Sequence, residues 1–327
     1  MPNGFFGKVL WIDLSEETFK EESLSEELIR QYLGGYGLAA RLIYENMPAK
    51  VDPLGPEAIL GFFPGLLTST VAPLSGRYMI AGKSPLTGTW GDANSGGTFG
   101  PEIKKCGFDG ILIKGIAKSP KYIAIIDDKI QILDASEFWG LDVVETEDKF
   151  IEKYGNVHIA SIGLSGEKLS LISGIVNDKA RIAARSGLGA LMGSKKLKAI
   201  VLKGNKKIPL LDKDSILNHT KEYNDRINKA TGGLTGIFKA FGTTAGNVFS
   251  GSSGDTPVRN WGGNSNEDFP VDRLNKISMH ALDKYKEKPY GCFSCPVRCG
   301  AIMKIPELGI DETHRPEYET CASFGAL

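Results

Sequence analysis

Three cysteines that lie close together constrain this chain more than any other feature of its sequence. Cys292, Cys295 and Cys299 form a C-x2-C-x3-C run in the segment CFSCPVRCG, and they are three of the chain's five cysteines. A secreted disulfide framework spreads its cysteines along the chain, so this clustering favours metal chemistry in a reducing compartment. Pro296 and Gly300 suit the tight turns that a metal-binding loop needs.

The spacing alone leaves the bound group open between two metal centres. A [4Fe–4S] cluster and a structural zinc both normally take four protein ligands. A zinc site is disfavoured because the nearest further candidates, His280, His314 and Cys321, do not stand at zinc-finger spacing. An iron–sulfur cluster is therefore the favoured interpretation, and zinc or a merely structural role for the three thiols remain the alternatives.

Composition and charge exclude several classes of function. The chain has 327 residues, enough for two domains, or for one domain and part of another. Its 39 basic residues balance 39 acidic ones, which argues against a nucleic-acid-binding protein. No apolar run reaches the roughly 18 residues that a membrane helix requires. Because the start MPNGFFGKVLWIDLS also lacks the features of a signal peptide, we predict a cytoplasmic protein.

The first two-thirds of the chain read mainly as strands and turns. Alternating apolar residues predict a hairpin over 122–133 that turns at Asp127 and Asp128, and a strand over 169–176. Helices are predicted at 143–154 and around 188–196, and Ser23 with Glu26 forms a capping box that predicts a further helix start.

A change in composition near residue 208 predicts a domain boundary. Residues 1–208 form the predicted β-sheet-rich domain, and residues 209–327 form a partial, mainly helical domain that carries the three clustered cysteines. In this second part we expect helices at about 215–229 and 278–285, with a glycine-rich, irregular segment between about 230 and 266.

Two glycine-rich stretches of the first domain contain arginines. Residues 73–110 include Arg77, and residues 177–200 include Arg181 and Arg185. Backbone N–H groups in glycine-rich turns and the guanidinium fork of arginine both bind phosphates and other polyanions. The alternative interpretation is that these are ordinary turns between strands with surface arginines.

Several motifs together resemble the tungsten-dependent aldehyde:ferredoxin oxidoreductase family. They are GRY, KSPLTG, ANSGG, RSGLGALMGSKKLKAI, the C-x2-C-x3-C run and RPEYET, in that order between Gly4 and the end of the chain. The resemblance implies an α+β fold, in which an N-terminal domain of two β-sheets with flanking helices forms a saddle-like base. The beginning of a mainly helical domain is expected to follow this base.

The same resemblance implies a set of cofactors. Family members hold tungsten, or sometimes molybdenum, between two molybdopterins whose phosphates bind Mg²⁺, and a nearby [4Fe–4S] cluster passes electrons to ferredoxin. By motif matching, Cys292, Cys295 and Cys299 are expected to ligate the cluster. The residues expected to bind the pterins are Arg77, Asn94, Ser95, Gly96, Arg181, Ile182, Ala183, Arg185 and Gly187. Backbone carbonyls at Asn94 and near position 182 are expected at the magnesium.

The implied reaction is the oxidation of an aldehyde to a carboxylic acid. Glu319 in PEYET matches the family's acidic residue near the metal, and it is expected to accept a proton from water or a hydrated aldehyde. The alternative for Glu319 is a solvated acid at a helix start, and Glu317 is expected to be a bystander. Other functions that this resemblance leaves open are reduction of carboxylates or aromatic thioesters, and a non-catalytic cofactor-binding fragment.

The sequence also departs from the family pattern. A fourth cluster cysteine, the D-x-x-G-L-C/D motifs that bind the pterins and an active-site histidine all come later in family members. We therefore expect further sequence or another polypeptide to supply them. Cys321 is expected to be a buried residue at an apolar helix start and not a ligand, and Cys106 a structural residue in a turn between strands.

The expected partners follow from the same resemblance. They are a small aldehyde and either ferredoxin or a ferredoxin-like electron-transfer subunit, with a homodimer as one assembly that the family allows. An oxidoreductase of this kind is expected to work in an anaerobic cytoplasm, without nucleic acid or membrane.

Overall fold

The computed structural model describes residues 3–230 and 233–326. The chain divides into two compact units. Unit 1 comprises Met1–Leu217 together with Cys292–Ser294, and unit 2 comprises Asn218–Gly291 together with Cys295–Leu327. Positions 1, 2 and 327, the ends of the two predicted domains, lie outside the described residues, as do positions 231 and 232.

Unit 1 is built on two six-stranded sheets. The first sheet has the order β2 (Thr18–Ser23), β1 (Lys8–Asp13), β6 (Ile111–Lys114), β3 (Leu60–Pro64), β4 (Tyr78–Lys83) and β5 (Trp90–Ser95). The second has the order β11 (Arg181–Ala183), β10 (Ile175–Asn177), β9 (His158–Ser161), β12 (Leu197–Lys203), β7 (Lys121–Ile126) and β8 (Lys129–Asp134). Both sheets are mixed, since β1 pairs with β6 and β12 pairs with β7 in parallel.

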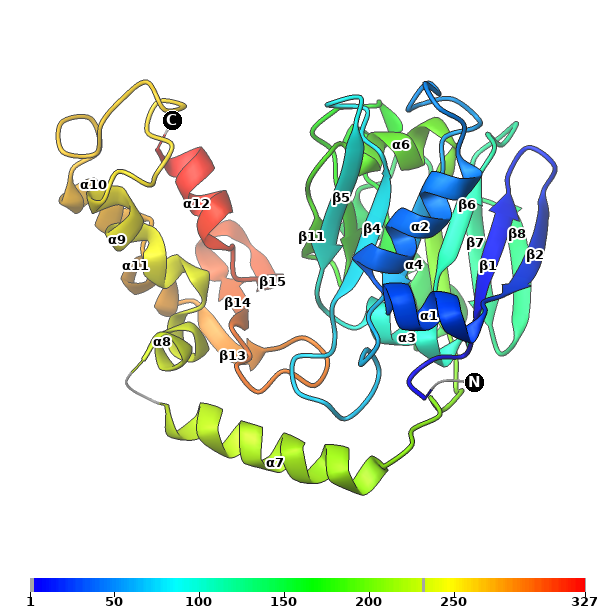
Figure 1. Ribbon diagram of the computed structural model, residues 1–327. Helices are drawn as coiled ribbons and strands as arrows, with labels where there is room; N and C mark the ends of the chain where they lie inside the picture. Colours follow the sequence, from blue (N-terminus) through cyan, green and yellow to red (C-terminus); the bar gives the residue numbers. More distant parts are fainter. Residues whose placement is uncertain (1–2, 231–232, 327) are drawn as a thin grey trace. The chain divides into compact units, whose positions relative to one another are not determined.

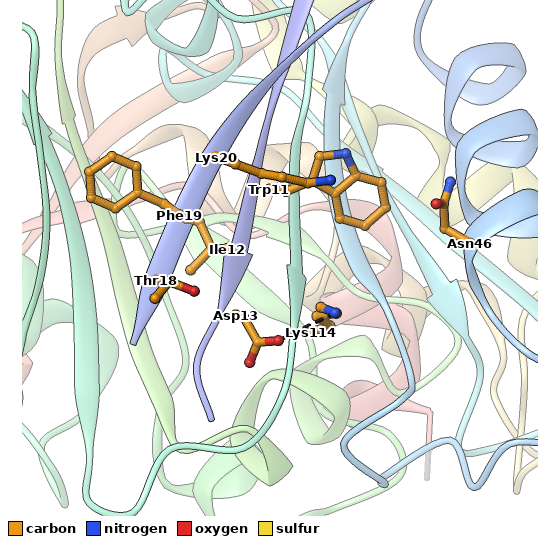
Figure 2. Close-up of a pocket in the computed structure, with 8 residues that line it drawn as sticks. All are labelled: Trp11, Ile12, Asp13, Thr18, Phe19, Lys20, Asn46 and Lys114. Carbon is orange, nitrogen blue, oxygen red and sulfur yellow. Dashed lines mark ion pairs between the residues drawn. The ribbon is translucent and has the colours of Figure 1, made fainter. Parts of the chain in front are cut away.

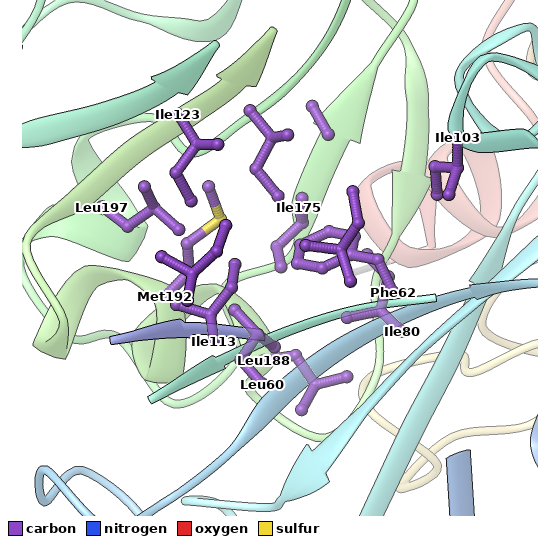
Figure 3. Close-up of a cluster of buried hydrophobic side chains, with 14 of the residues drawn as sticks. Leu60, Phe62, Ile80, Ile103, Ile113, Ile123, Ile175, Leu188, Met192 and Leu197 are labelled. Carbon is purple, nitrogen blue, oxygen red and sulfur yellow. The ribbon is translucent and has the colours of Figure 1, made fainter. Parts of the chain in front are cut away.

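The largest core lies between the two sheets. Successive side chains of a strand point to opposite faces, so Leu10 and Ile12 of β1 enter this core, whereas Val9 and Trp11 join a separate core on the other face. Figure 3 shows part of the inter-sheet core, in which Leu60 of the first sheet and Leu197 of the second take part. Two helices, α3 (Phe99–Lys105) and α6 (Leu188–Ser194), contribute to it as well.

Further helices cover the outer faces of both sheets (Figure 1). On the first sheet, α1 (Glu26–Tyr32) and α2 (Tyr36–Asn46) bury Ile29 and Leu38 against strand residues. On the second, α4 (Val143–Tyr154) buries Phe150 against Tyr122 of β7. These layers confirm the predicted α+β fold of two β-sheets with flanking helices.

Local sequence signals explain several elements of unit 1. The side chain of Asp142 accepts hydrogen bonds from the backbone of Val144 and Glu145 and completes a capping box at the start of α4. The predicted hairpin is confirmed as β7 and β8, and both turn residues, Asp127 and Asp128, have positive φ.

Unit 2 combines short helices with a three-stranded sheet. Its sheet has the order β13 (Lys286–Tyr290), β14 (Gly300–Ile305) and β15 (Ile310–His314). Its helical elements are α8 (Leu234–Phe241), η1 (Thr243–Gly246), α9 (Asn247–Ser252), α10 (Val271–Lys276), α11 (Met279–Asp283), η2 (Pro306–Leu308) and α12 (Tyr318–Gly325). A small core of Val258, Phe269, Leu274 and Ala326 joins its helical parts. Helix α7 (Lys213–Lys229) begins in unit 1 and ends in unit 2.

Three predictions of local structure were wrong. Helix α1 is capped by Ser25, whose hydroxyl accepts from the N–H of Leu28, because Ser23 is still paired in β2. Of the predicted strand over 169–176, only the last two residues are in a strand, β10, because Leu169 turns with positive φ after helix α5 (Leu164–Glu167) and residues 171 and 172 form a second turn. The segment expected to be irregular contains α8, η1 and α9.

Two cysteines also lie in surroundings other than those predicted. Cys106 is buried as expected, but it ends helix α3 and is not in a turn between strands. Cys321 lies inside α12 and is half-buried, because it is not on the face that carries the buried Ala322.

Candidate functional site

The structure brings the two glycine- and arginine-rich stretches together at one edge of unit 1. Strand β11 of the second sheet lies beside β5 of the first (Figure 1). The hydroxyl of Ser186 donates to the carbonyl of Asp92 at 3.2 Å, and the hydroxyl of Ser84 donates to the carbonyl of Ser186 at 2.8 Å. Residues about a hundred positions apart in the sequence are therefore in direct contact at this edge.

Arg77 stands at this edge with an exposed side chain. Its Nε donates to Oδ1 of Asn94 at 2.6 Å, and its Nη2 contacts both Oδ1 and the backbone carbonyl of Asn94. Asn94 in turn donates to the hydroxyl of Tyr36 at 3.4 Å. The guanidinium is therefore held in place while it remains open to an anion from solvent.

The glycine loop that follows β5 is fixed by Asn177, a residue that the sequence did not single out. Oδ1 of Asn177 accepts from the hydroxyl of Ser95 at 2.8 Å, and its Nδ2 donates to the carbonyl of Gly96 at 3.0 Å. The hydroxyl of Tyr78 also donates to Oδ1, at 3.0 Å. Burial raises the pKa of Tyr78, so the phenol keeps the proton that this bond needs.

Asp178 fixes the next two residues of the same loop. One of its carboxylate oxygens accepts from the N–H of Thr98 at 2.7 Å, and the other accepts from the hydroxyl of Thr98 at 2.8 Å. A side chain at Gly97, where φ is +84°, would collide with this carboxylate. Asn177 and Asp178 lie at the turn between β10 and β11, so this turn shapes the ANSGG loop.

Gly96 has a second neighbour in unit 1, the thiol of Cys292. A Cβ at Gly96 would lie 2.6 Å from Sγ of Cys292 and 3.5 Å from Nη1 of Arg77, so the missing side chain leaves room between thiol and guanidinium. The N–H of Phe293 donates to the carbonyl of Gly97 at 3.0 Å, and the N–H of Leu74 donates to the carbonyl of Ser294 at 2.9 Å. The first cysteine of the run is therefore anchored on the glycine loop.

The remaining candidate pterin-binding residues differ in exposure. Arg185 and Ile182 are exposed, Arg181 is half-buried, and Ala183 is fully buried in the inter-sheet core. Gly187 has a positive φ of +66° at the start of α6, and a side chain there would collide with the carbonyl of Leu171, so the fold itself requires glycine at this position.

The other candidate residues belong to unit 2. Cys295 and Cys299 are half-buried, and Glu319 is exposed in the first turn of α12. The carboxylate of Glu317 accepts from the hydroxyl of Thr243 at 2.5 Å. Within residues 3–230 and 233–326, no three cysteine, histidine or acidic side chains are arranged as a metal site.

A hollow of about 260 Å³ beside β1 and β2 contains none of the predicted site residues (Figure 2). An ion pair of 3.3 Å between Asp13 and Lys114 lies on its wall, next to Trp11 and Asn46. The residues predicted from the sequence therefore point to the β5 and β11 edge and not to this hollow.

Comparison with known proteins identifies the chain's relatives. The model of the aldehyde ferredoxin oxidoreductase N-terminal domain matches residues 9–204, and the model of domains 2 and 3 of the same enzymes matches residues 218–327. The chain belongs to the aldehyde ferredoxin oxidoreductase family. This confirms the family resemblance of the sequence motifs.

Two curated members show how far the similarity extends. Over 99% of this chain, it is 41% identical to the tungsten-containing aldehyde ferredoxin oxidoreductase of Thermococcus kodakarensis and covers 53% of that protein. It is 31% identical over 98% of its length to an aliphatic sulfonate oxidoreductase, WOR-like subunit, of Pyrococcus furiosus, and again covers 53%. The chain thus spans about half the length of these relatives, and oxidoreductases with different substrates are among them.

A solved structure supports the fold independently. The chain superposes with a TM-score of 0.85 on the active-site complex BamBC of benzoyl coenzyme A reductase, covering 100% of this chain and 53% of that one, at 22% identity. At this identity the likeness bears on the fold alone. None of the helices in the described part of this family member has the length and apolar composition that crossing a membrane requires.

Proposed function

We propose that this chain forms part of an enzyme that oxidises aldehydes to carboxylic acids at a bis-pterin tungsten centre. The observation that carries the proposal is the edge of unit 1 where Arg77, the bare backbone of Gly96 and the thiol of Cys292 meet. An arginine beside side-chain-free backbone fits a phosphate-bearing pterin, and a thiol next to it fits a cluster ligand. The residues present therefore fit both cofactors.

Each cofactor has its own residues in this proposal. The cluster would be held by Cys292, Cys295 and Cys299. One pterin would lie against Arg77 and residues 94–96, and the other against Arg181, Ile182 and Arg185, beside the buried Ala183 and Gly187. Mg²⁺ would be held through the carbonyl of Asn94 and a carbonyl near position 182. When bound, these groups take up two electrons from the substrate and deliver them singly to ferredoxin or to a ferredoxin-like subunit.

The chain's own contribution to the chemistry is binding and proton transfer. Oxidation of an aldehyde by water yields a carboxylic acid, two electrons and two protons. Glu319 accepts a proton from the attacking water or the hydrated aldehyde, for which an exposed carboxylate is suited. Arg77 and Asn94, held to each other, keep the anionic end of the cofactor in one position.

Anaerobic purification of the native protein tests this function. We expect tungsten, pterin and about four irons per chain, and reduction of a viologen dye when aldehydes are added. Zinc without pterin would contradict the proposal. Arg77→Ala should lower the pterin and tungsten content, whereas Arg30→Ala, which removes only an exposed ion pair of 2.7 Å with Glu26, should not.

Two further measurements separate the alternatives. Glu319→Gln should lower kcat by about a hundredfold or more with unchanged metal content, and Glu312→Gln, another exposed acid of unit 2, should retain full activity. A panel of aldehydes, carboxylates and aromatic thioesters defines the substrate and the direction. Full cofactor content with no turnover on any of them would indicate a non-catalytic binding chain.

A further inference from the structure

A second hollow of unit 1, of about 610 Å³, has no role in the proposed function. It lies at the end of α3, between the loop at 69–71 and the segment that follows β12. None of the candidate cofactor residues lines it. Its volume lies in the range of pockets that hold small organic ligands.

The lining of this lysine pocket is strongly basic. It includes Lys105, Lys206, Lys207 and Lys213, and no acidic residue of the described chain belongs to the lining. Lys105 pairs with the buried Glu102 at 3.0 Å, and Lys206 pairs with Asp128 at 2.7 Å. Lys207 and Lys213 are exposed and form no ion pair within the described residues, so their charges are available to a ligand.

Backbone contacts hold the walls of the pocket together. The N–H of Lys206 donates to the carbonyl of Lys105 at 2.9 Å, and the N–H of Gly204 donates to the carboxylate of Glu102 at 2.8 Å. These bonds tie the segment after β12 to the end of α3. The backbones of Lys105 and Lys206 are therefore held together before any ligand binds, which lowers the ordering cost of binding.

The remaining walls suggest what kind of anion fits. Val71, Ile208 and Leu210 provide apolar surface, and Thr70 adds a polar group. A ligand with an apolar body and an anionic head would contact both kinds of wall. The two available ammonium groups, those of Lys207 and Lys213, favour a dianion over a singly charged carboxylate. We propose that the lysine pocket binds a small organic phosphate, a role that lies beyond the proposed oxidoreductase function.

The pocket is linked to the segment that carries Cys292. The hydroxyl of Ser294 donates to the carbonyl of Val71 at 3.4 Å, and the N–H of Leu74 donates to the carbonyl of Ser294 at 2.9 Å. A ligand that contacts Val71 therefore restricts the loop on which Ser294 is anchored. Occupation of the pocket is expected to slow the exchange of the Leu74 N–H with solvent.

Titration of the full purified protein with phenyl phosphate, followed by calorimetry, tests this proposal. Phenyl phosphate should bind more tightly than inorganic phosphate, which lacks the apolar ring, and more tightly than benzoate, which lacks the phosphate. Lys207→Glu and Lys213→Glu should each weaken binding by about tenfold or more. Lys149→Glu, an exposed lysine of α4 outside the pocket, is the matched control and should bind as the parent does. Hydrogen exchange at residues 69–75 should slow only when phenyl phosphate is present.

Three results would overturn the proposal. The first is no binding of phenyl phosphate at millimolar concentration. The second is a loss of affinity in Lys149→Glu as large as in the two pocket variants. It would show that binding depends only on the overall surface charge of the protein. The third is tighter binding of benzoate than of phenyl phosphate. Because all three lysines are exposed, the variants should fold, and circular dichroism confirms this before each titration.

Discussion

The side-chain amide of Asn177 holds the backbone carbonyl of Gly96, a residue that precedes it by 81 positions, at 3.0 Å. The other end of the same amide accepts from Tyr78 and Ser95, so one buried side chain satisfies three polar groups. The conformation of the glycine loop therefore depends on a residue in the opposite sheet.

Asn177→Ala should destabilise the protein by about 3 kcal/mol, because it leaves buried polar groups without partners. It should also lower pterin content, since the loop at Gly96 loses its support. Chemical denaturation of the full chain measures the first effect and pterin analysis the second. Asn156→Ala, at an exposed position, should change neither. Normal pterin content in a destabilised Asn177→Ala protein would show that Asn177 stabilises the fold but does not support pterin binding.

Gly96→Ala should displace Cys292, since the added methyl group would lie 2.6 Å from its sulfur. We expect less iron and acid-labile sulfide per chain, and a loss of about 1–3 kcal/mol of stability from crowding. Gly233→Ala is the control, because a Cβ there meets nothing within 4 Å. Unchanged iron content in Gly96→Ala would show that the thiol of Cys292 is not a ligand.

Because of Lys195, the free energy of unfolding should increase as the pH rises above neutrality. Its fully buried ammonium donates to the carbonyl of Gly115, at 3.3 Å, and burial lowers the pKa from 10.5 to about 7, although Asp13 opposes this. Between these two values the unfolded chain binds the proton and the folded chain does not, so the free energy of unfolding increases with pH. The rise should be on the order of 4 kcal/mol.

Denaturation curves at pH 6, 8 and 10 measure this effect. Lys195→Met should abolish the rise and should be more stable than the parent protein at pH 6, where the parent buries a charged ammonium group. Lys149→Met should retain the parent's pH dependence because this lysine is exposed. A rise that persists in Lys195→Met would contradict the assignment.

Glu147 should have the opposite effect in a lower pH range. Burial raises the pKa of its carboxyl from 4.5 to about 7, and Asp178 and Asp148 add to the rise while the N–H of Lys179 opposes it. The folded chain holds a proton that the unfolded chain has lost, so stability falls as pH rises from 4.5 to 7. In Glu147→Gln, the decrease in the free energy of unfolding between pH 5 and 7 should be smaller than in the parent by about 2–3 kcal/mol. Denaturation curves at these two pH values measure it. Glu152→Gln, on the exposed side of the same helix, should leave it unchanged.

Local signals were enough to predict elements that carry their own start and stop residues. Helix α4 begins at a capping box on Asp142 and ends at Gly155, and the β7–β8 hairpin turns on two aspartates with positive φ. Helix α8 was missed because it lies in a glycine-rich segment. Five of its eight residues are apolar or aromatic, but Gly233, Gly236 and Gly242 in and beside it weaken the sequence signal for a helix.

The site was only half predictable for a different reason. Arg77 and the ANSGG loop could be proposed from the sequence because glycine-rich turns and arginine forks are groups that bind phosphates. Asn177 and Asp178 look like ordinary turn residues, and their role arises only when β11 comes to lie beside β5. Strand β5 was missed too, because its sequence WGDANS lacks the apolar alternation that predicts a strand.

The anchoring of Phe293 on Gly97 also bears on the order of events during synthesis. The chain leaves unit 1 at Leu217 and returns to it only at Cys292, so the ribosome must release residues 218–291 before the anchor can form. The entropic cost of closing a loop grows only slowly with its length. The main consequence of the long loop is therefore that this contact forms later during synthesis. A nascent chain can therefore pair all the sheet strands of unit 1 before Phe293 reaches the glycine loop, so the contact between Phe293 and Gly97 forms late in synthesis.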